Sequence, residues 1–124
     1  MVFLKRAYDT ASNDDGQRFL VERLWPRGVK KNALRIVGWL KDVAPSTSLR
    51  KWFAHDPAKW NEFRRCYFAE LDMHRDALRP LLDAAKQGDI TLVYSSHDLE
   101  HNNAVALKGY LERKLGLVRS KKAA

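Results

Sequence analysis

The apolar run Ile90–Tyr94 is the feature that most constrains what this chain can fold into. It reads Ile-Thr-Leu-Val-Tyr, follows Gly88-Asp89 and precedes Ser95-Ser96, so turn residues bound it on both sides. A strand without polar alternation needs cover on both of its faces, as in the middle of a parallel sheet. We therefore predict a buried strand here that is central in its sheet.

Two more segments have the composition of strands, and a third is ambiguous. Residues 2–8 and 18–24 are apolar stretches separated by a polar, turn-rich loop at 9–16. We expect these two strands to be neighbours in the sheet. Residues 30–43 fit a short helical turn followed by an irregular or extended piece, which Pro45 ends.

Four helices are predicted from their start and end signals. Ser46 or Thr47 can cap the first, and Asp56 followed by Pro57 is a strong start for the second. Pro80 is incompatible with one unbroken helix through the middle of the chain. We expect the helices at residues 47–53, 57–73, 76–87 and 101–115.

This order of elements predicts a single α/β domain with a small, central, mostly parallel sheet and flanking helices. The length of 124 residues suits one domain, expected at 1–118, with 119–124 as a basic, flexible tail. No apolar run approaches the roughly 20 residues of a membrane span. The lone cysteine, Cys66, is expected to be a small core residue, and we expect a cytoplasmic protein without membrane association.

The net charge of +8 is concentrated in residues 17–52, which contain nine Lys or Arg and two acids. Such a field favours an anionic partner, whether a phosphorylated small molecule, a nucleotide or nucleic acid. A solvated basic face with no ligand explains the same pattern. The chain contains no recognised nucleic-acid-binding motif, and its oligomeric state stays open.

One candidate ligand site is a turn that carries two arginines and a tryptophan. Arg23, Trp25 and Arg27 surround a Pro–Gly turn, and guanidinium forks and an indole together suit a phosphate or a nucleotide. Arg50 and Lys51 can add to the same positive pocket. The alternative is that Trp25 packs into the core and the arginines pair with acids to fix the turn.

The second candidate site is the loop that follows the predicted central strand. Ligands of α/β folds gather beyond the carboxyl ends of such strands, and a helix N-terminus attracts anions. We therefore expect Ser95, Ser96, Asn102 and Asn103 to bind an anion there. Helix capping alone also explains polar residues at these positions.

Catalysis is the alternative for the same loop. His97, Asp98 and His101 are candidate acid–base groups, and either histidine would have to activate Ser95 or Ser96 as a nucleophile. The histidines are four residues apart, a spacing that suits zinc, but the local sequence supplies no third ligand. We expect no metal and no cofactor.

Six short motifs, in order along the chain, resemble those of the YeaO-like branch of domain-of-unknown-function family 488. The resemblance extends from about residue 2 to residue 115. The motifs are Arg-Leu-Trp-Pro-Arg-Gly at 23–28, Trp-Leu-Lys-Asp at 39–42, Ala-Pro-Ser at 44–46, Leu-Arg-Lys-Trp-Phe at 49–53, His-Asp-Pro at 55–57 and Asp-Leu-Glu-His-Asn at 98–102. The resemblance implies an α/β fold similar to the rhodanese and cysteine-phosphatase group, with an anion-binding loop between a strand and a helix.

The chain departs from the family pattern where a nucleophile would stand. Other branches resemble one another in having a cysteine near the end of that strand and Cys-His-Arg at the start of the helix. This chain has Tyr94 and Asn102-Asn103-Ala104 instead. We therefore expect a non-catalytic or catalytically altered binder of a phosphate-containing anion. A small hydrolase or transferase using His97, Asp98 or His101, and a nucleic-acid-binding module, are the alternatives.

Overall fold

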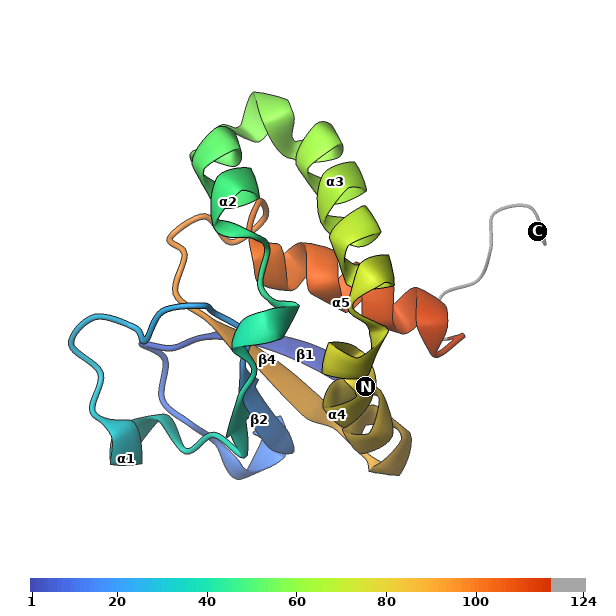
Figure 1. Ribbon diagram of the computed structural model, residues 1–124. Helices are drawn as coiled ribbons and strands as arrows, with labels where there is room; N and C mark the ends of the chain where they lie inside the picture. The colour runs from blue at the N-terminus through green and yellow to red at the C-terminus, as the bar shows by residue number, and fades with distance from the viewer. Residues whose placement is uncertain (117–124) are drawn as a thin grey trace.

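The computed structural model describes residues 1–116, and its centre is a four-stranded parallel sheet in the order β1-β4-β2-β3 (Figure 1). The strands are β1 (Val2–Arg6), β2 (Gln17–Leu20), β3 (Gly38–Trp39) and β4 (Ile90–Tyr94). All five residues of β4 are buried, and the strand pairs with β1 on one side and β2 on the other. The predicted α/β class and the central strand are therefore confirmed. The expected tail lies outside the described residues.

The expectation that the first two strands are neighbours is wrong, because β4 lies between them. Leu92 of β4 is opposite Leu4 of β1 and Phe19 of β2. The segment between β1 and β2 contains a short 3-10 turn, η1 (Asn13–Asp15), and returns the chain so that both strands run the same way. β2 also ends earlier than expected, since the chain leaves the sheet after the N–H of Val21 has donated to the carbonyl of Val93.

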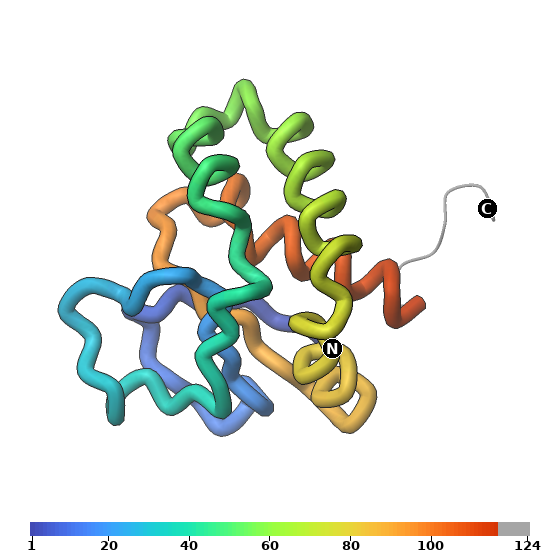
Figure 2. The backbone as a smooth tube through the Cα atoms, viewed as in Figure 1, coloured from blue at the N-terminus to red at the C-terminus, as the bar shows by residue number. Residues whose placement is uncertain are grey.

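Four helices form the larger core with one face of the sheet. They are α2 (Thr47–Phe53), α3 (Trp60–Met73), α4 (Arg75–Gln87) and α5 (Asn103–Lys114). Phe19, Leu92 and Tyr94 supply part of the sheet side of this core, and Phe63 and Leu107 part of the helix side. In the backbone trace α2 and α3 form a hairpin that stands above the sheet, with α5 passing behind its base (Figure 2).

The other face of the sheet is covered by a mostly irregular segment. After β2 the chain passes through α1 (Lys31–Leu34), β3 and the 3-10 turn η2 (Lys41–Val43), as the ambiguous pattern predicted. Leu20 and Val93 of the sheet pack here with Leu34, and Trp25 and Trp39 lie against the same cluster. Because both faces are covered, β4 needs no polar alternation.

Two of the predicted helix starts are confirmed by their caps. The hydroxyl of Ser46 accepts from the N–H of Leu49 at 3.2 Å and begins α2. Asp56 accepts from the N–H of Ala58 at 3.0 Å and caps η3 (Pro57–Lys59), which leads directly into α3. Each side-chain oxygen satisfies a backbone donor that the helix itself cannot.

The break between α3 and α4 falls at His74, within two residues of the expected new start. Pro80 lies inside α4, in its second turn, and does not end the helix. On α3 the residues Phe63, Tyr67 and Leu71 form a buried stripe, whereas Trp60 is half-buried. α5 is shorter than expected because Asn102 is its cap and not part of the helix.

A buried ion-pair cluster fixes the return between β1 and β2. Asp15 accepts from Arg18 at 2.6 Å and from Lys5 at 3.0 Å, and Arg18 also donates to the carbonyl of Leu34 at 3.0 Å. Burial by itself raises the pKa of Asp15, but hydrogen bonds from the Ser12 N–H, Lys5 and Arg18 together hold it below its ordinary value. One cation of the basic segment is thus neutralised inside the fold.

Gly16 gives a direct test of this return. It has a φ of 65°, and a Cβ on it would lie 2.0 Å from the carbonyl oxygen of Asp89. We predict that Gly16→Ala lowers the free energy of unfolding by more than about 2 kcal/mol, because the substitution combines a left-handed backbone with a clash against main chain. Urea unfolding measures the change.

Gly109→Ala is the matched control. Gly109 is exposed inside α5, and a Cβ there has nothing within 4 Å. Since alanine favours a helix over glycine by about 0.8–1.0 kcal/mol, this variant should be more stable than the native protein. A Gly16→Ala protein as stable as the native one would contradict the described path between η1 and β2.

Candidate functional site

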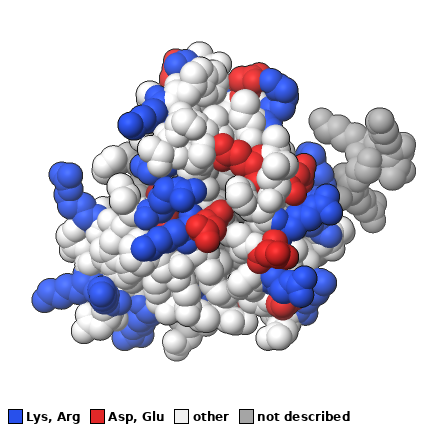
Figure 3. Space-filling view, in the orientation of Figure 1, with Lys and Arg blue, Asp and Glu red and all other residues white. Residues whose placement is uncertain are grey.

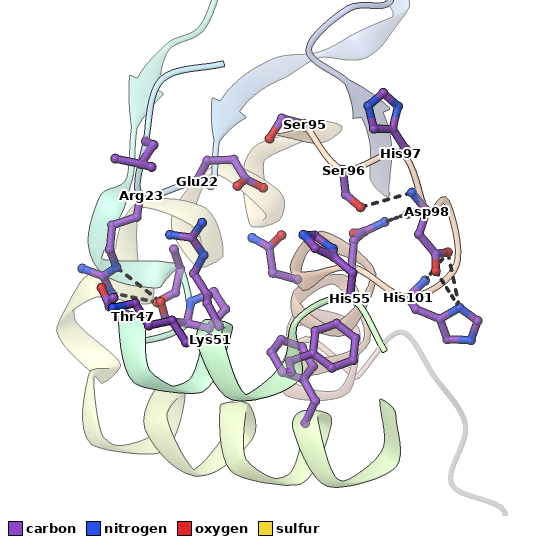
Figure 4. Close-up of a pocket in the computed structure, with 18 residues that line it drawn as sticks. Glu22, Arg23, Thr47, Lys51, His55, Ser95, Ser96, His97, Asp98 and His101 are labelled. Atoms are coloured by element: carbon purple, nitrogen blue, oxygen red, sulfur yellow. Dashed lines mark hydrogen bonds and ion pairs between the residues drawn. The ribbon is translucent and has the colours of Figure 1, made fainter. Parts of the chain in front are cut away.

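A cavity of about 700 Å³ opens at the carboxyl end of the sheet (Figure 4). The loop that follows β4 and the residues that follow β2 form one side of it, and α2 forms another. Parallel strands bring their carboxyl ends to the same edge, where α/β proteins bind ligands. The volume lies within the range of about 300–1,000 Å³ that is usual for small-molecule sites.

The structure brings most of the predicted site residues together around this cavity. The lining residues include the whole catalytic set and most of the ligand-binding set, namely Arg23, Ser95, Ser96, His97, Asp98, His101, Asn102 and Asn103. Arg50 and Lys51 also line it, as the sequence suggested. Trp25 and Arg27 are not among the lining residues in the described part of the chain.

The turn at residues 23–28 has a structural role that explains where its side chains lie. The indole N–H of Trp25 donates to the carbonyl of Val29 at 2.6 Å, and its ring meets Trp39 edge-on at 5.4 Å between centroids. Arg27 is exposed, and its carbonyl accepts from the hydroxyl of Tyr8 at 3.0 Å. Trp25 therefore packs against the smaller core, which was the alternative interpretation of this motif.

Arg23 faces the cavity but is held by main chain. Its guanidinium donates to the carbonyls of Ala44 at 3.1 Å and Pro45 at 3.3 Å. The alternative in which this arginine pairs with an acid is not what the structure shows. Two of its donors are thus used to connect the turn to the start of α2.

The free positive charge in the cavity comes from α2. Arg50 and Lys51 are exposed residues near the end of this seven-residue helix. Within residues 1–116 neither side chain forms an ion pair or a hydrogen bond. Ala54 and His55, both with positive φ, then turn the chain so that His55 also lines the cavity. Two cations therefore remain available to a ligand.

The loop opposite is held by Arg6, at the end of β1, which the sequence analysis did not single out. Its guanidinium donates to the carbonyl of Ser96 at 2.9 Å and to that of Ser95 at 3.5 Å. Its Nη2 is also 3.3 Å from Nδ1 of His97. Because a guanidinium can only donate, this contact is a hydrogen bond only when Nδ1 of His97 carries no proton and accepts.

Asp98 and His101 form a closed local pair. The Asp98 carboxylate accepts from the N–H groups of Glu100 and His101, each at 2.9 Å, and lies 3.1 Å from Nδ1 of His101. The Glu100 and His101 N–H groups hold the pKa of Asp98 below its ordinary value. The His101 ring meets Trp60 edge-on at 5.4 Å. The hydrogen bonds of the Asp98 carboxylate are thus formed within its own loop.

The serine hydroxyls lack the activation that catalysis requires. Ser96 Oγ accepts from the N–H of Asp98 at 3.2 Å, as in an ordinary turn. In the described chain, the hydroxyls of Ser95 and Ser96 have no hydrogen bond to His97 or His101. A nucleophilic serine needs a base within hydrogen-bond reach. The geometry therefore favours turn and cap roles for this loop.

The two asparagines at the start of α5 are also engaged. Asn102, which is buried, accepts from the N–H of Val105 at 2.9 Å and donates to the carbonyl of Asp98 at 2.8 Å. Asn103 donates to the carbonyl of Val21 at 2.8 Å. The backbone N–H of Asn103 lies in the first turn, where a helix has no acceptor for it.

Glu22 is the lining residue whose role the sequence analysis missed. It follows the last sheet contact of β2, and its Oε1 is buried without a hydrogen-bond partner among the described residues. Burial raises the pKa of its carboxyl, while Arg50, the Asn103 side chain and the Ser95 backbone partly oppose that shift. Its signal in the sequence was an acid directly after a strand that ends at the ligand-binding edge.

The positions linked to cysteine chemistry do not supply a reactive thiol. Tyr94, at the position where the resemblance implies a cysteine in other branches, is buried, and burial raises the pKa of its hydroxyl. Cys66 lies half-buried on α3 and its thiol donates to Glu62 at 3.5 Å. Burial raises the pKa of that thiol too. Among the residues described, the cavity is lined by neither of them.

Across residues 1–116, no three His, Cys, Asp or Glu side chains are grouped so that they could hold a metal ion. His97 and His101 lie in a loop and face different partners. No helix in the described part of the chain is long and apolar enough to cross a membrane.

Comparison with known proteins shows the family. The profile described as the inactive DUF488-N3 subclade matches residues 1–123, and the chain belongs to this family. It is 44% identical over 107 residues to the uncharacterized protein YeaO of Escherichia coli K12, covering 86% of this chain and 93% of that protein. It is 38% identical over 106 residues to the uncharacterized protein Rv3073c of Mycobacterium tuberculosis H37Rv and to Mb3100c of Mycobacterium bovis, covering 86% of this chain and 89% of each relative.

No solved structure gives a significant match to the chain. The resemblance to the rhodanese and cysteine-phosphatase group therefore stays a prediction. The subclade's description as inactive agrees with the expected loss of the nucleophile.

The cap of α5 can be tested apart from any ligand. We predict that Asn102→Ala lowers the free energy of unfolding by about 1–2 kcal/mol, because it removes a cap and leaves buried backbone groups unpaired. Asn102→Asp keeps the cap oxygen and should lose less. Asn32→Ala, at an exposed position of α1, is the control and should be close to neutral. Equal stability of all three variants in urea would contradict the structural role of Asn102.

Proposed function

We propose that this protein is a non-catalytic binder of a phosphate-containing anion and that the ligand occupies the cavity between α2 and the β4–α5 loop. One observation carries the proposal. Arg50 and Lys51 have no partner among residues 1–116, and they face the same cavity as the start of α5. Cations held near a helix N-terminus form a common arrangement for anion binding.

The cavity supplies two kinds of attraction for such a ligand. The α5 N-terminus carries a partial positive charge, with the N–H of Asn103 free of a helical acceptor. The hydroxyls of Ser95, Ser96 and Thr47 line the same space. Together they supply donors around an anion whose charge the α2 side chains balance.

Several observations support binding over catalysis. The chain belongs to a subclade described as inactive. The histidines are bound to Arg6 and Asp98 and not to a serine. Cys66 is directed to Glu62, away from the lining residues. A hydrolase or transferase at His97, Asp98 or His101 has no comparable support.

The distribution of charge supports a small ligand over a nucleic acid. Arg18 is used in the buried cluster and Arg23 on main-chain carbonyls. On the face drawn in Figure 3 the remaining Lys and Arg form separate groups with uncharged and acidic surface between them. A nucleic-acid backbone is better matched by a continuous basic track.

The single thiol suits a reducing compartment, and we place the protein in the cytoplasm.

Removing the free cations tests the proposal. We predict that the double variant Arg50→Gln/Lys51→Gln binds pyrophosphate about tenfold or more weakly than the native protein, since each charged hydrogen bond contributes roughly 1.5–3 kcal/mol. Isothermal titration calorimetry at constant ionic strength measures the change.

Lys30→Gln/Lys31→Gln is the matched control, because it removes the same charge from exposed positions outside the cavity. It should bind pyrophosphate like the native protein. Equal weakening in both double variants would contradict the cavity as the site. A steep loss of oligonucleotide binding with salt in the native protein would favour the nucleic-acid alternative.

A further inference from the structure

The carboxylates of the cavity differ in how many hydrogen bonds they already accept. Among the described residues, two carboxylates line it, those of Glu22 and Asp98. Asp98 already accepts from the N–H groups of Glu100 and His101 and from the His101 ring. Glu22 has a buried oxygen with no donor among the residues described. Of these two carboxylates, Glu22 is therefore the one with an oxygen still open to a further donor, beside the Asn103 amide and the Ser95 N–H.

An unpaired buried carboxylate oxygen lowers the stability of the fold, so we expect a functional reason for its presence. Leaving a buried acceptor without a donor costs about 1–3 kcal/mol, and more when the group is charged. Native proteins retain few such groups, and those that remain are often functional. Glu22 also lies where β2 leaves the sheet, on the edge at which the ligand is proposed to bind.

The groups around Glu22 define what its partner must be. Arg50 attracts the carboxylate but forms no ion pair with it in residues 1–116, and the Asn103 amide and the Ser95 N–H stabilise its charged form from the loop side. Tyr67, the other near neighbour, has its hydroxyl committed to the carbonyl of Val43. A molecule placed between Glu22 and Arg50 therefore meets an acceptor on one side and a cation on the other.

We propose that the ligand carries a hydrogen-bond donor, best an ammonium group, close to its phosphate, and that Glu22 accepts from this donor while Arg50 and Lys51 hold the phosphate. This inference rests on the proposed function and narrows it to the class of phosphorylated amines. Phe53, Phe63 and Leu24 also line the cavity and supply apolar surface for a short carbon skeleton.

Two small probes that differ in one group provide the test. Phosphoethanolamine carries a phosphate and an ammonium, whereas ethyl phosphate carries the phosphate alone. We predict that the native protein binds phosphoethanolamine about tenfold more tightly, as expected for one hydrogen bond to a charged group. The protein's net charge of +8 opposes an added ammonium, so a preference for it requires a local acceptor.

Glu22→Gln assigns the preference to this side chain. The variant should bind both probes with similar affinity and keep its affinity for ethyl phosphate. Glu100→Gln is the control, because it removes the same charge from an exposed neighbour of the cavity that does not line it. It should keep the native preference. Thermal unfolding of each variant checks that the fold is intact.

The outcomes separate this inference from the proposed function. Equal binding of the two probes by the native protein overturns the role of Glu22 but leaves anion binding standing. A preference that survives in Glu22→Gln also overturns it. No binding of either probe to the native protein overturns both proposals. Because the first comparison uses the native protein alone, a Glu22→Gln variant that fails to fold does not remove the test.

Discussion

The parallel pairing of β4 on both sides is the constraint on which the rest of this structure depends. With β1 on one side and β2 on the other, β4 brings three carboxyl ends to one edge of the sheet. Arg6, Glu22 and Ser95 come from three distant parts of the sequence and meet there for this reason. Arg6 then fixes the loop after β4 through main-chain carbonyls, which defines one wall of the cavity.

Covering both faces of β4 also decides which side chains are free. The segment after β2 must cover the face opposite the helices, and Trp25 and Trp39 are used for that purpose. Arg23 connects the same segment to the start of α2. The remaining cations of the cavity, Arg50 and Lys51, come from a helix that packs on the other face. Arg23 and Arg27 of the turn at residues 23–28 therefore do not supply the free charge of the cavity, although the sequence suggested a binding role for them.

Local signals in the sequence predicted much of the fold. The apolar run of β4, the Ser46 and Asp56 caps and the short elements within residues 30–43 depend on near neighbours and are confirmed. The order of the strands was not predictable in this way, because it depends on pairing between β1 and a strand more than eighty residues later. For the same reason the candidate site was predicted as two separate pieces. Glu22 and Arg6 lie at the site only because the strands pair in this order. Trp25 does not line the cavity because it packs against the smaller core.

The central claim is that a phosphate-containing anion binds in this cavity and not over the basic surface. The most direct measurement is an NMR titration of the ¹⁵N-labelled protein with phosphoethanolamine at constant ionic strength, following the backbone amides. We expect saturable shifts confined to residues 95–103, the end of α2 and Glu22. Shifts that are absent, or that spread without saturation over exposed lysines such as Lys30 and Lys31, would contradict it.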